Sequence, residues 1–241
     1  MESLLIKFEG SENYLYYRDN FKYKDTFSMK KPAITEQPIH SILADRWSSR
    51  AYDPTQFVSQ ELLLSLMEAA RWSPSCMGDQ PWQFIVFNKK DATPWTQALN
   101  CLSIGNQNWA MDASILILAC AHQNFSNNEK TNRWGQYDTG ASSENICLQA
   151  TSLGMVAHQM GGFDVEKTRQ LFQIPSQYDL MSFIAIGYPL AIEKVNADSG
   201  VALSSADYEQ VVSTGVERDI QNELVLAPLF REVPMTSANM I

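Results

Sequence analysis

The sequence predicts one α+β domain with a central sheet covered by helices. Three compact runs of apolar and aromatic residues, at 82–87, 113–121 and 181–189, are typical of buried strands. Segments with the apolar spacing of helices lie between these runs, and their irregular alternation with the strands favours the α+β class. At 241 residues the chain is long enough to bury a sizeable core.

Two helices are predicted before the first strand. Apolar residues recur at helical spacing in "IHSILADRW", residues 39–47. Pro54 follows and cannot continue a helix. Ser59 can cap the second helix, with Glu61 in its first turn. The apolar face of this second helix is formed by Leu62, Leu63, Leu66, Met67 and Ala70.

The centre of the chain predicts further helices around the second strand. A helix is expected at about 92–103, and the polar segment 124–132 is expected to be a mobile loop. Residues 133–155 predict a long helix with few charges and with apolar positions nearly all round it. Such a helix is expected to be buried in a large core or in a subunit interface.

The ends of the chain are less regular than its centre. A short helix at 165–174 is expected to stop at Pro175. Residues 1–37 are interpreted as an N-terminal extension and residues 38–241 as the domain, with a strand candidate at 222–230 in its tail.

Charge and cysteine content exclude several classes of function. The chain has 18 basic and 27 acidic residues, a formal net charge of -9, whereas nucleic-acid binding requires a basic surface. No apolar run is long enough for a membrane span, and no secretory signal is predicted. The four cysteines and three histidines form no metal-binding spacing, and reduced thiols in a cytoplasmic protein are expected.

The first segment that could carry chemistry is "RWSSR", in which Arg46 and Arg50 flank two hydroxyl groups. Arginine matches a phosphate group in charge and in geometry, and serine adds a neutral donor. The alternative is an exposed helix end with solvated arginines.

The second segment is "SPSCMGDQPW", residues 73–82. Its prolines restrict the backbone, and Gly78 permits a positive φ or the close approach of a ligand. The alternative is a connecting turn. Cys76 would be a nucleophile only beside a base or a positive field, and the sequence indicates no such partner.

The third segment is "HQMGGFD", residues 158–164. Two adjacent glycines remove side chains where a flat ligand could approach, although a tight turn explains them equally well. His158 is either an acid–base group or a structural histidine, and the structural role is favoured.

Taken together, these segments resemble the nitroreductase family of flavoproteins. The shared pattern runs through residues 38–189 in order: Arg-x-Ser-x-Arg, an amphipathic helix, Pro-Ser-x-x-x-x-Gln-Pro-Trp before a strand, a helix of small residues, Met-Gly-Gly-Phe, and "AIGYP". The resemblance implies an α+β homodimer with a mainly antiparallel sheet and an extended C-terminal segment. It also implies that FMN binds in a groove between the subunits.

The resemblance assigns each segment to a part of FMN. The first segment would take the phosphate and ribityl chain, the second would lie along the flavin ring, from the other subunit, and the third would bring a backbone amide near N5. By position, the cofactor-binding residues would be Arg46, Trp47, Ser48, Arg50, Pro74, Ser75, Met77, Gly78, Gln80, Met160, Gly161, Gly162 and Arg218.

Three positions depart from the family pattern. Many members carry Asn at the position of Gly78 and Glu at the position of Gly161. The family also often ends with a basic pair that completes the phosphate site, whereas Arg218 lies between Glu217 and Asp219. Either Arg218 suffices together with Arg46 and Arg50, or phosphate binding is weaker.

The resemblance implies an FMN-dependent oxidoreductase without a catalytic side chain or metal. NADH or NADPH would give hydride to the flavin and leave, and a nitroaromatic or quinone acceptor would then bind, in a ping-pong mechanism. One alternative is a flavin-binding or sensing protein without turnover. Another keeps the fold but changes the chemistry, for example to reductive dehalogenation or flavin breakdown.

Overall fold

The computed structural model describes residues 32–190. Predictions for residues 1–31, for Arg218 and for the strand and extended segment of the C-terminal tail lie outside the described residues. The described helices are α1 (Ser41–Asp45), α2 (Gln60–Arg71), the 3₁₀ turn η1 (Cys76–Gly78), α3 (Ala92–Leu99), α4 (Ile104–Ala110), α5 (Gly135–Ser152) and α6 (Val165–Leu171).

Four antiparallel strands form the central sheet. In chain order they are β1 (Trp82–Asn88), β2 (Ile115–His122), β3 (Val156–Met160) and β4 (Tyr178–Gly187). Their order across the sheet is β1-β2-β4-β3, so the two longest strands lie in the middle. Every strand pair is antiparallel, and the register of β2 and β4 shifts between Ala119 and Cys120. The predicted α+β class with an antiparallel sheet is confirmed.

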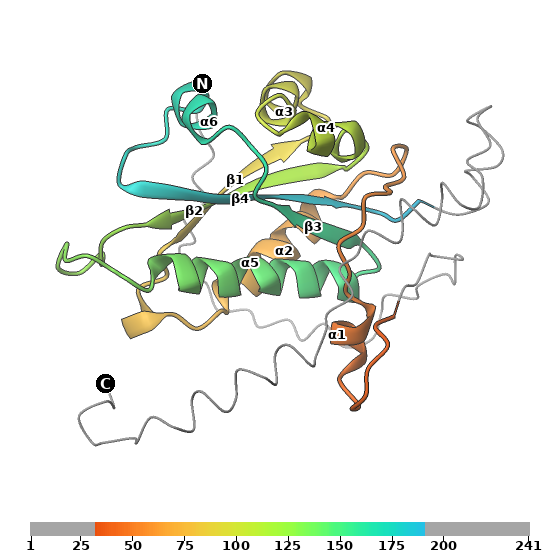
Figure 1. Cartoon of the computed structure of the whole chain (residues 1–241), viewed down its shortest axis with the longest axis horizontal. Helices are drawn as coiled ribbons and strands as arrows, with labels where there is room; N and C mark the ends of the chain where they lie inside the picture. The colour runs from red at the N-terminus through yellow and green to blue at the C-terminus, as the bar shows by residue number, and fades with distance from the viewer. Residues whose placement is uncertain (1–31, 191–241) are drawn as a thin grey trace.

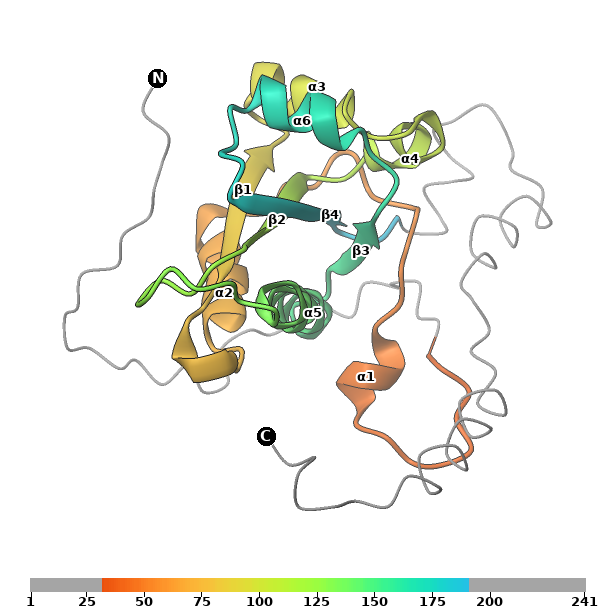
Figure 2. The ribbon, with the colours of Figure 1, turned by 60° about the vertical axis from the view of Figure 1, so that its left-hand side comes forward.

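Helices cover both faces of this sheet (Figure 1). Figure 2 shows α3, α4 and α6 on one side and α2 and α5 on the other. The side chains of β2 alternate between the two layers. Leu116 and Leu118 pack in the first layer, and Ile115 and Ile117 pack in the second. All residues of β2 except His122 are buried.

Two predictions, the capped helix α2 and the buried cysteines, match the structure closely. Helix α2 begins after Ser59, whose side chain accepts a hydrogen bond from the amide of Leu62, as expected for a cap. Cys120 and Cys147 are buried in the core, and burial raises the pKa of each thiol to about 12. Both therefore remain protonated thiols at neutral pH.

The predicted helix at 92–103 is wrong at its end. Helix α3 stops at Leu99, and α4 begins separately at Ile104. Between them the chain turns to contact the segment after β3. The amide of Ser103 donates to the carbonyl of Gly162 at 2.9 Å, and Leu102 forms an isolated bridge with Phe163. Pairing with a distant segment therefore replaces the last turn of the helix.

The boundaries of several other elements also differ from the predictions. Helix α1 is shorter than the 39–47 pattern. Helix α6 ends at Leu171, before Pro175, and Gln173 in the turn between them has a positive φ of 52°. Strand β1 lies at the sheet edge and is only partly buried. Strand β3 was not predicted, because its polar residues His158 and Gln159 interrupt the apolar pattern at the opposite edge.

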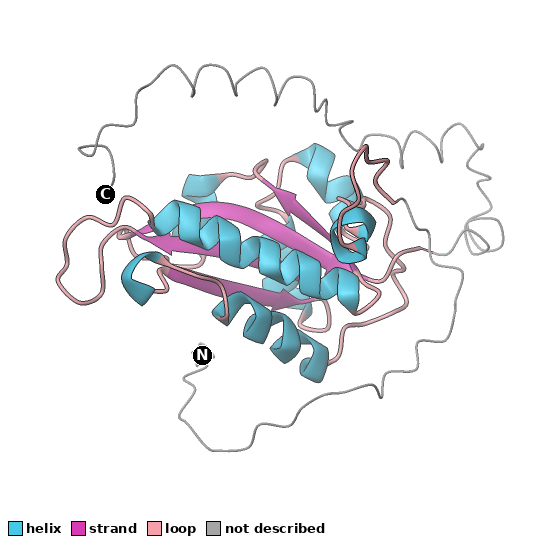
Figure 3. Ribbon diagram, turned by 90° about the horizontal axis from the view of Figure 1, so that it is seen from below, coloured by secondary structure: helices cyan, strands magenta, loops and turns pink. Residues whose placement is uncertain are grey.

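Helix α5 lies beside α2 on one face of the sheet, as Figure 3 shows from below. Its prediction as a buried helix is confirmed for one side only. Ile146 and Ala150 are buried, whereas Tyr137 is 78% exposed. Much of the buried side consists of small or hydroxylated residues, which lets the helix approach its neighbours closely.

In the first turn of α5, Gly135 lies so close to β2 that no larger residue fits there. A Cβ atom at Gly135 would lie 2.6 Å from the backbone carbonyl oxygen of His122. We expect Gly135→Ala to lower the free energy of unfolding by about 1–3 kcal/mol, because the β2 backbone must shift. Urea denaturation would measure the change.

Gly105→Ala is the matched control, since a Cβ there meets no atom within 4 Å and Gly105 also lies in a first helical turn. That variant should be as stable as the original chain or more stable by up to about 1 kcal/mol. Equal midpoints for the two variants would contradict the packing argument.

Candidate functional site

The loop that follows α1 is attached to β3. Nδ1 of His158 lies 3.0 Å from the carbonyl oxygen of Ser49, so this nitrogen carries the hydrogen and donates it. The hydroxyl of Tyr52 donates to the same carbonyl at 3.2 Å. Ser49 is fully buried. The first and third segments of the sequence are therefore joined by a histidine with a structural contact, the role that was favoured for it.

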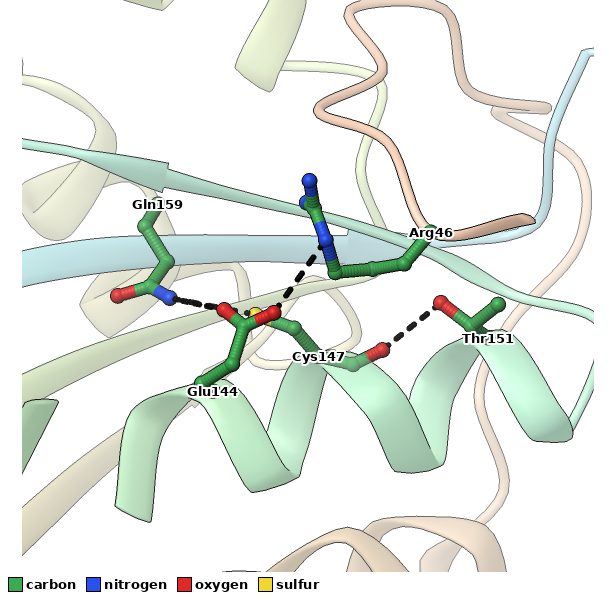
Figure 4. Close-up of polar contacts among 5 residues, drawn as sticks. All are labelled: Arg46, Glu144, Cys147, Thr151 and Gln159. Carbon is green, nitrogen blue, oxygen red and sulfur yellow. Dashed lines mark hydrogen bonds and ion pairs between the residues drawn. The ribbon is translucent and has the colours of Figure 1, made fainter. Parts of the chain in front are cut away.

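Arg46 is held in place by an ion pair with α5. Its Nε lies 3.3 Å from Oε1 of Glu144, and its side chain is only 20% exposed. The other carboxylate oxygen of Glu144 accepts a hydrogen bond from Nε2 of Gln159 at 3.1 Å. Figure 4 shows the far end of the Arg46 guanidinium turned away from Glu144. Arg46 is thus an ordered side chain and not a solvated arginine.

Arg50 is held by an aromatic ring. Its guanidinium carbon lies 5.9 Å from the centre of the Trp109 ring, and that ring packs against His158 with centres 4.5 Å apart. Within residues 32–190, Arg50 forms no ion pair with a carboxylate. Burial is the main cause that lowers the pKa of His158, and the nearby Arg50 and Arg46 lower it further. The positive charge here therefore comes from the arginines.

The loop at 74–80 has an unusual backbone. Met77, Gly78 and Gln80 have φ values of 56°, 68° and 51°. Positive φ is strained for Met and Gln, by about 1–3 kcal/mol per residue, and such strain concentrates at binding sites. Met77 is 73% exposed, and the amide of Gln80 donates to Oγ of Ser75 at 3.0 Å. The loop therefore presents an ordered, exposed main chain.

Two carboxylates anchor this loop. Oδ2 of Asp138, on α5, accepts from the amide of Cys76 at 2.9 Å. The carboxylate of Asp79 accepts from Ser126 and from the side chain of Asn132. Among the described residues, no basic side chain hydrogen-bonds the thiol of Cys76, so the structure supplies no activating partner for it.

The two glycines after β3 have different surroundings. An added Cβ at Gly161 would meet no atom within 4 Å, whereas one at Gly162 would lie 2.8 Å from Nδ2 of Asn106. Gly162 thus allows the chain to pack closely against α4, whereas the space beside Gly161 is open. Both line a surface groove of about 500 Å³, together with Ser103 and Lys167. The side chain of Met160 is buried in the core, so only its backbone could meet a ligand.

The predicted residues fall into two groups in a single chain. Residues 46–50 and the end of β3 lie together through His158, Glu144 and Gln159. Trp47 is half-buried and Ser48 exposed within the same loop. The η1 turn, by contrast, is bonded to the first turn of α5 through Cys76 and Asp138, about two helical turns before Glu144. One chain therefore does not bring all three segments together.

Sequence reasoning missed the residues that hold the site. Glu144 and Asp138 are polar positions in a helix judged by its apolar residues, and Trp109 lies in a segment expected to lead into β2. Asp138 and Glu144 are the two charged residues of α5, and their presence on a helix of small and apolar residues was the available signal for both.

Two negative findings concern residues 32–190. No cluster of three or more His, Cys, Asp or Glu side chains in this part of the chain could hold a metal ion. None of its helices has both the length and the apolar character needed to cross a bilayer.

Comparison with known proteins gives matches over this same region. A family model described as the nitroreductase family matches residues 43–104 and 102–188. A protein of Methanothermobacter thermautotrophicus, provisionally named NADH dehydrogenase/NAD(P)H nitroreductase, is 29% identical over 160 residues, which cover 65% of this chain and 80% of that protein.

Two solved structures share the fold. A crystal structure described as an oxidoreductase containing FMN is 32% identical with a TM-score of 0.62, and the match covers 65% of this chain and 80% of that one. An FMN-dependent nitroreductase of Clostridium difficile is 26% identical with a TM-score of 0.53, covering 67% and 94%. With a family model matched across most of the described region, and with the fold and motifs in agreement, the chain belongs to the nitroreductase family.

Proposed function

We propose that this protein is an FMN-dependent oxidoreductase that transfers electrons from NADH or NADPH to a nitroaromatic or quinone. The observation that carries the proposal is the joining of two ordered arginines to a strand, β3, that is followed by an open glycine, Gly161. FMN in the names of two solved relatives supports the choice of cofactor.

The donor set fits the phosphate of FMN. Arg46 uses only Nε within the described residues, which leaves both terminal nitrogens of its guanidinium for an anion. Arg50 has no carboxylate partner there, and the exposed Ser48 adds a hydroxyl donor. Guanidinium groups with unused donors bind phosphate by paired, charge-assisted hydrogen bonds.

The backbone fits a flat ring. Gly161 offers its main chain without a side chain over it, and the exposed turn at Met77 and Gly78 offers a second stretch of main chain. Gly161 can offer its amide, whereas the amide of Gly78 donates to the carbonyl of Ser75 at 3.0 Å. Neither residue supplies the side-chain contact of family members with Glu or Asn at these positions. The pocket would therefore recognise the ring mainly by main-chain atoms.

Bound FMN would supply the redox chemistry, accepting two electrons from NAD(P)H and passing them to the acceptor after NAD(P)⁺ has left. In the net reaction a quinone, NAD(P)H and a proton give a hydroquinone and NAD(P)⁺. A nitro group, NAD(P)H and a proton give a nitroso group, water and NAD(P)⁺. The protein's residues bind and orient the ligands. His158 is committed to Ser49, so the proton is expected to come from water.

We also propose a homodimer built around α5. Tyr137 is 78% exposed on the outer side of α5, and Met77 is 73% exposed beside its first turn. A two-fold axis across α5 would place the 74–80 loop of one protomer next to the 46–50 loop of its partner. Assembly would thus unite the segments that one chain keeps apart.

The purified full chain tests the proposed activity. We expect the yellow absorbance of an oxidised flavin, its release as FMN on denaturation, and loss of the absorbance when NADH or NADPH is added without oxygen. Bound flavin that neither nucleotide reduces would favour a binding or sensing protein. Colourless protein that does not take up FMN would contradict the proposal.

Light scattering tests the assembly. We expect twice the mass of the chain, because the ring site needs loops from two protomers. Tyr137→Glu should shift the protein toward monomer and weaken flavin binding, since it places charge in the proposed interface. A flavin-loaded monomer of the unmodified chain would overturn the dimer.

The arginine pair tests where the phosphate binds. Replacing both Arg46 and Arg50 with Ala should weaken FMN binding by about 3–6 kcal/mol, the value of two charge-assisted hydrogen bonds. Riboflavin, which lacks the phosphate, should bind almost as before. The matched control replaces Lys89 and Lys90 with Ala, which removes the same charge beyond the end of β1. Equal losses of FMN affinity in both double variants would place the phosphate elsewhere.

A further inference from the structure

We propose that Glu144 is a built-in counter-ion of the anion site, and that it limits how strongly the site prefers a phosphorylated ligand over its unphosphorylated analogue. The inference rests on the proposed function, because it takes the arginines of the first segment as the phosphate-binding groups. It adds a residue to which none of the sequence motifs assigns a role.

The carboxylate of Glu144 is fixed at both oxygens. Oε1 faces Nε of Arg46 at 3.3 Å, and Oε2 accepts from Nε2 of Gln159 at 3.1 Å. Gln159 is itself held on β3 and also contacts the sulfur of Cys147 at 3.6 Å. Glu144 therefore cannot swing away easily when an anion approaches, and its charge stays beside the arginine.

Glu144 leaves the end of the Arg46 guanidinium accessible. Among the described residues, Arg46 makes its ion pair through Nε, and Figure 4 shows the terminal nitrogens pointing away from the carboxylate. An anion on those nitrogens would share the guanidinium with Glu144 without displacing it. The glutamate and the bound anion would thus repel each other across one arginine.

The repulsion between Glu144 and a bound anion affects anion affinity because few charges surround the two arginines. Within residues 32–190, Glu144 is the only carboxylate that forms an ion pair with Arg46 or Arg50. A phosphate monoester carries a charge of about −1.5 to −2 at neutral pH. Because the side chain of Glu144 is 43% exposed, water screens the repulsion in part. The carboxylate would therefore reduce the affinity for phosphate without abolishing it.

The test compares FMN with riboflavin on the full chain freed of bound flavin. We expect Glu144→Gln to bind FMN about 3- to 10-fold more tightly, the effect of removing one unit charge several ångströms away in a partly screened site. Riboflavin affinity should not change, and inorganic phosphate should compete with FMN at lower concentrations. Quenching of flavin fluorescence gives each dissociation constant.

Glu166→Gln is the matched control. Glu166 lies on α6, and its carboxylate likewise accepts a hydrogen bond from a glutamine side chain, that of Gln170. The substitution removes the same charge away from the arginines, so the ratio of FMN to riboflavin affinity should stay as in the original chain.

Glu144→Ala separates a counter-ion from a residue that merely positions Arg46. A counter-ion predicts a raised ratio of FMN to riboflavin affinity in both Glu144 variants. A positioning role predicts a lower ratio in the Ala variant and recovery in the Gln variant. An unchanged or lower ratio in both variants would overturn the proposal. If the original chain does not prefer FMN to riboflavin, the phosphate site itself is wrong, which is a different result.

Discussion

The inner side of α5 carries few large side chains, and this allows the helix to lie close to both α2 and the sheet. The hydroxyl groups buried there find acceptors within the structure. Thr139 donates to the carbonyl of Gly135 at 2.7 Å, and Ser142 donates to the carbonyl of Ala70 at 2.9 Å. A buried hydroxyl without a partner would cost about 1–3 kcal/mol, so these bonds are what make a polar helix tolerable in the core. Because α5 is fixed in this way, Asp138 and Glu144 are fixed as well, and each carboxylate holds one segment of the candidate site.

The fold was largely predictable from local patterns, since its class depends on a few long elements. The continuous apolar run of β2 and the capped, amphipathic α2 are signals that survive in any tertiary context. The failures lie where a distant contact decides the local structure. Strand β3 forms because β4 offers a free edge, although its own sequence is half polar. The helix predicted through residue 103 breaks because Ser103 bonds to Gly162, a partner that local spacing cannot indicate.

The candidate site divides in the same way. Its contiguous motifs could be read directly, because arginines beside hydroxyl groups and glycines in a short loop suggest anion and backbone contacts. The residues that orient those motifs could not. Trp109 and Glu144 are distant from Arg50 and Arg46 in the sequence, and only the packing of α4, α5 and β3 brings them together. The motif alone also does not separate the packing of the two adjacent glycines. A side chain at Gly162 would collide with Asn106, whereas one at Gly161 would meet open space.

The proposed function does not require a catalytic side chain from this architecture. A cofactor that carries the redox chemistry needs to be held at both ends and approached by its substrates, and main-chain groups on ordered segments can hold it. The side chains around such a cofactor then affect binding mainly through their charge. The candidate anion site contains two guanidinium groups and one ion-paired carboxylate, with His158 kept largely neutral by burial. Because α5 and β3 hold that carboxylate rigidly, a change at one helical position can alter anion affinity while the surrounding backbone stays as it is.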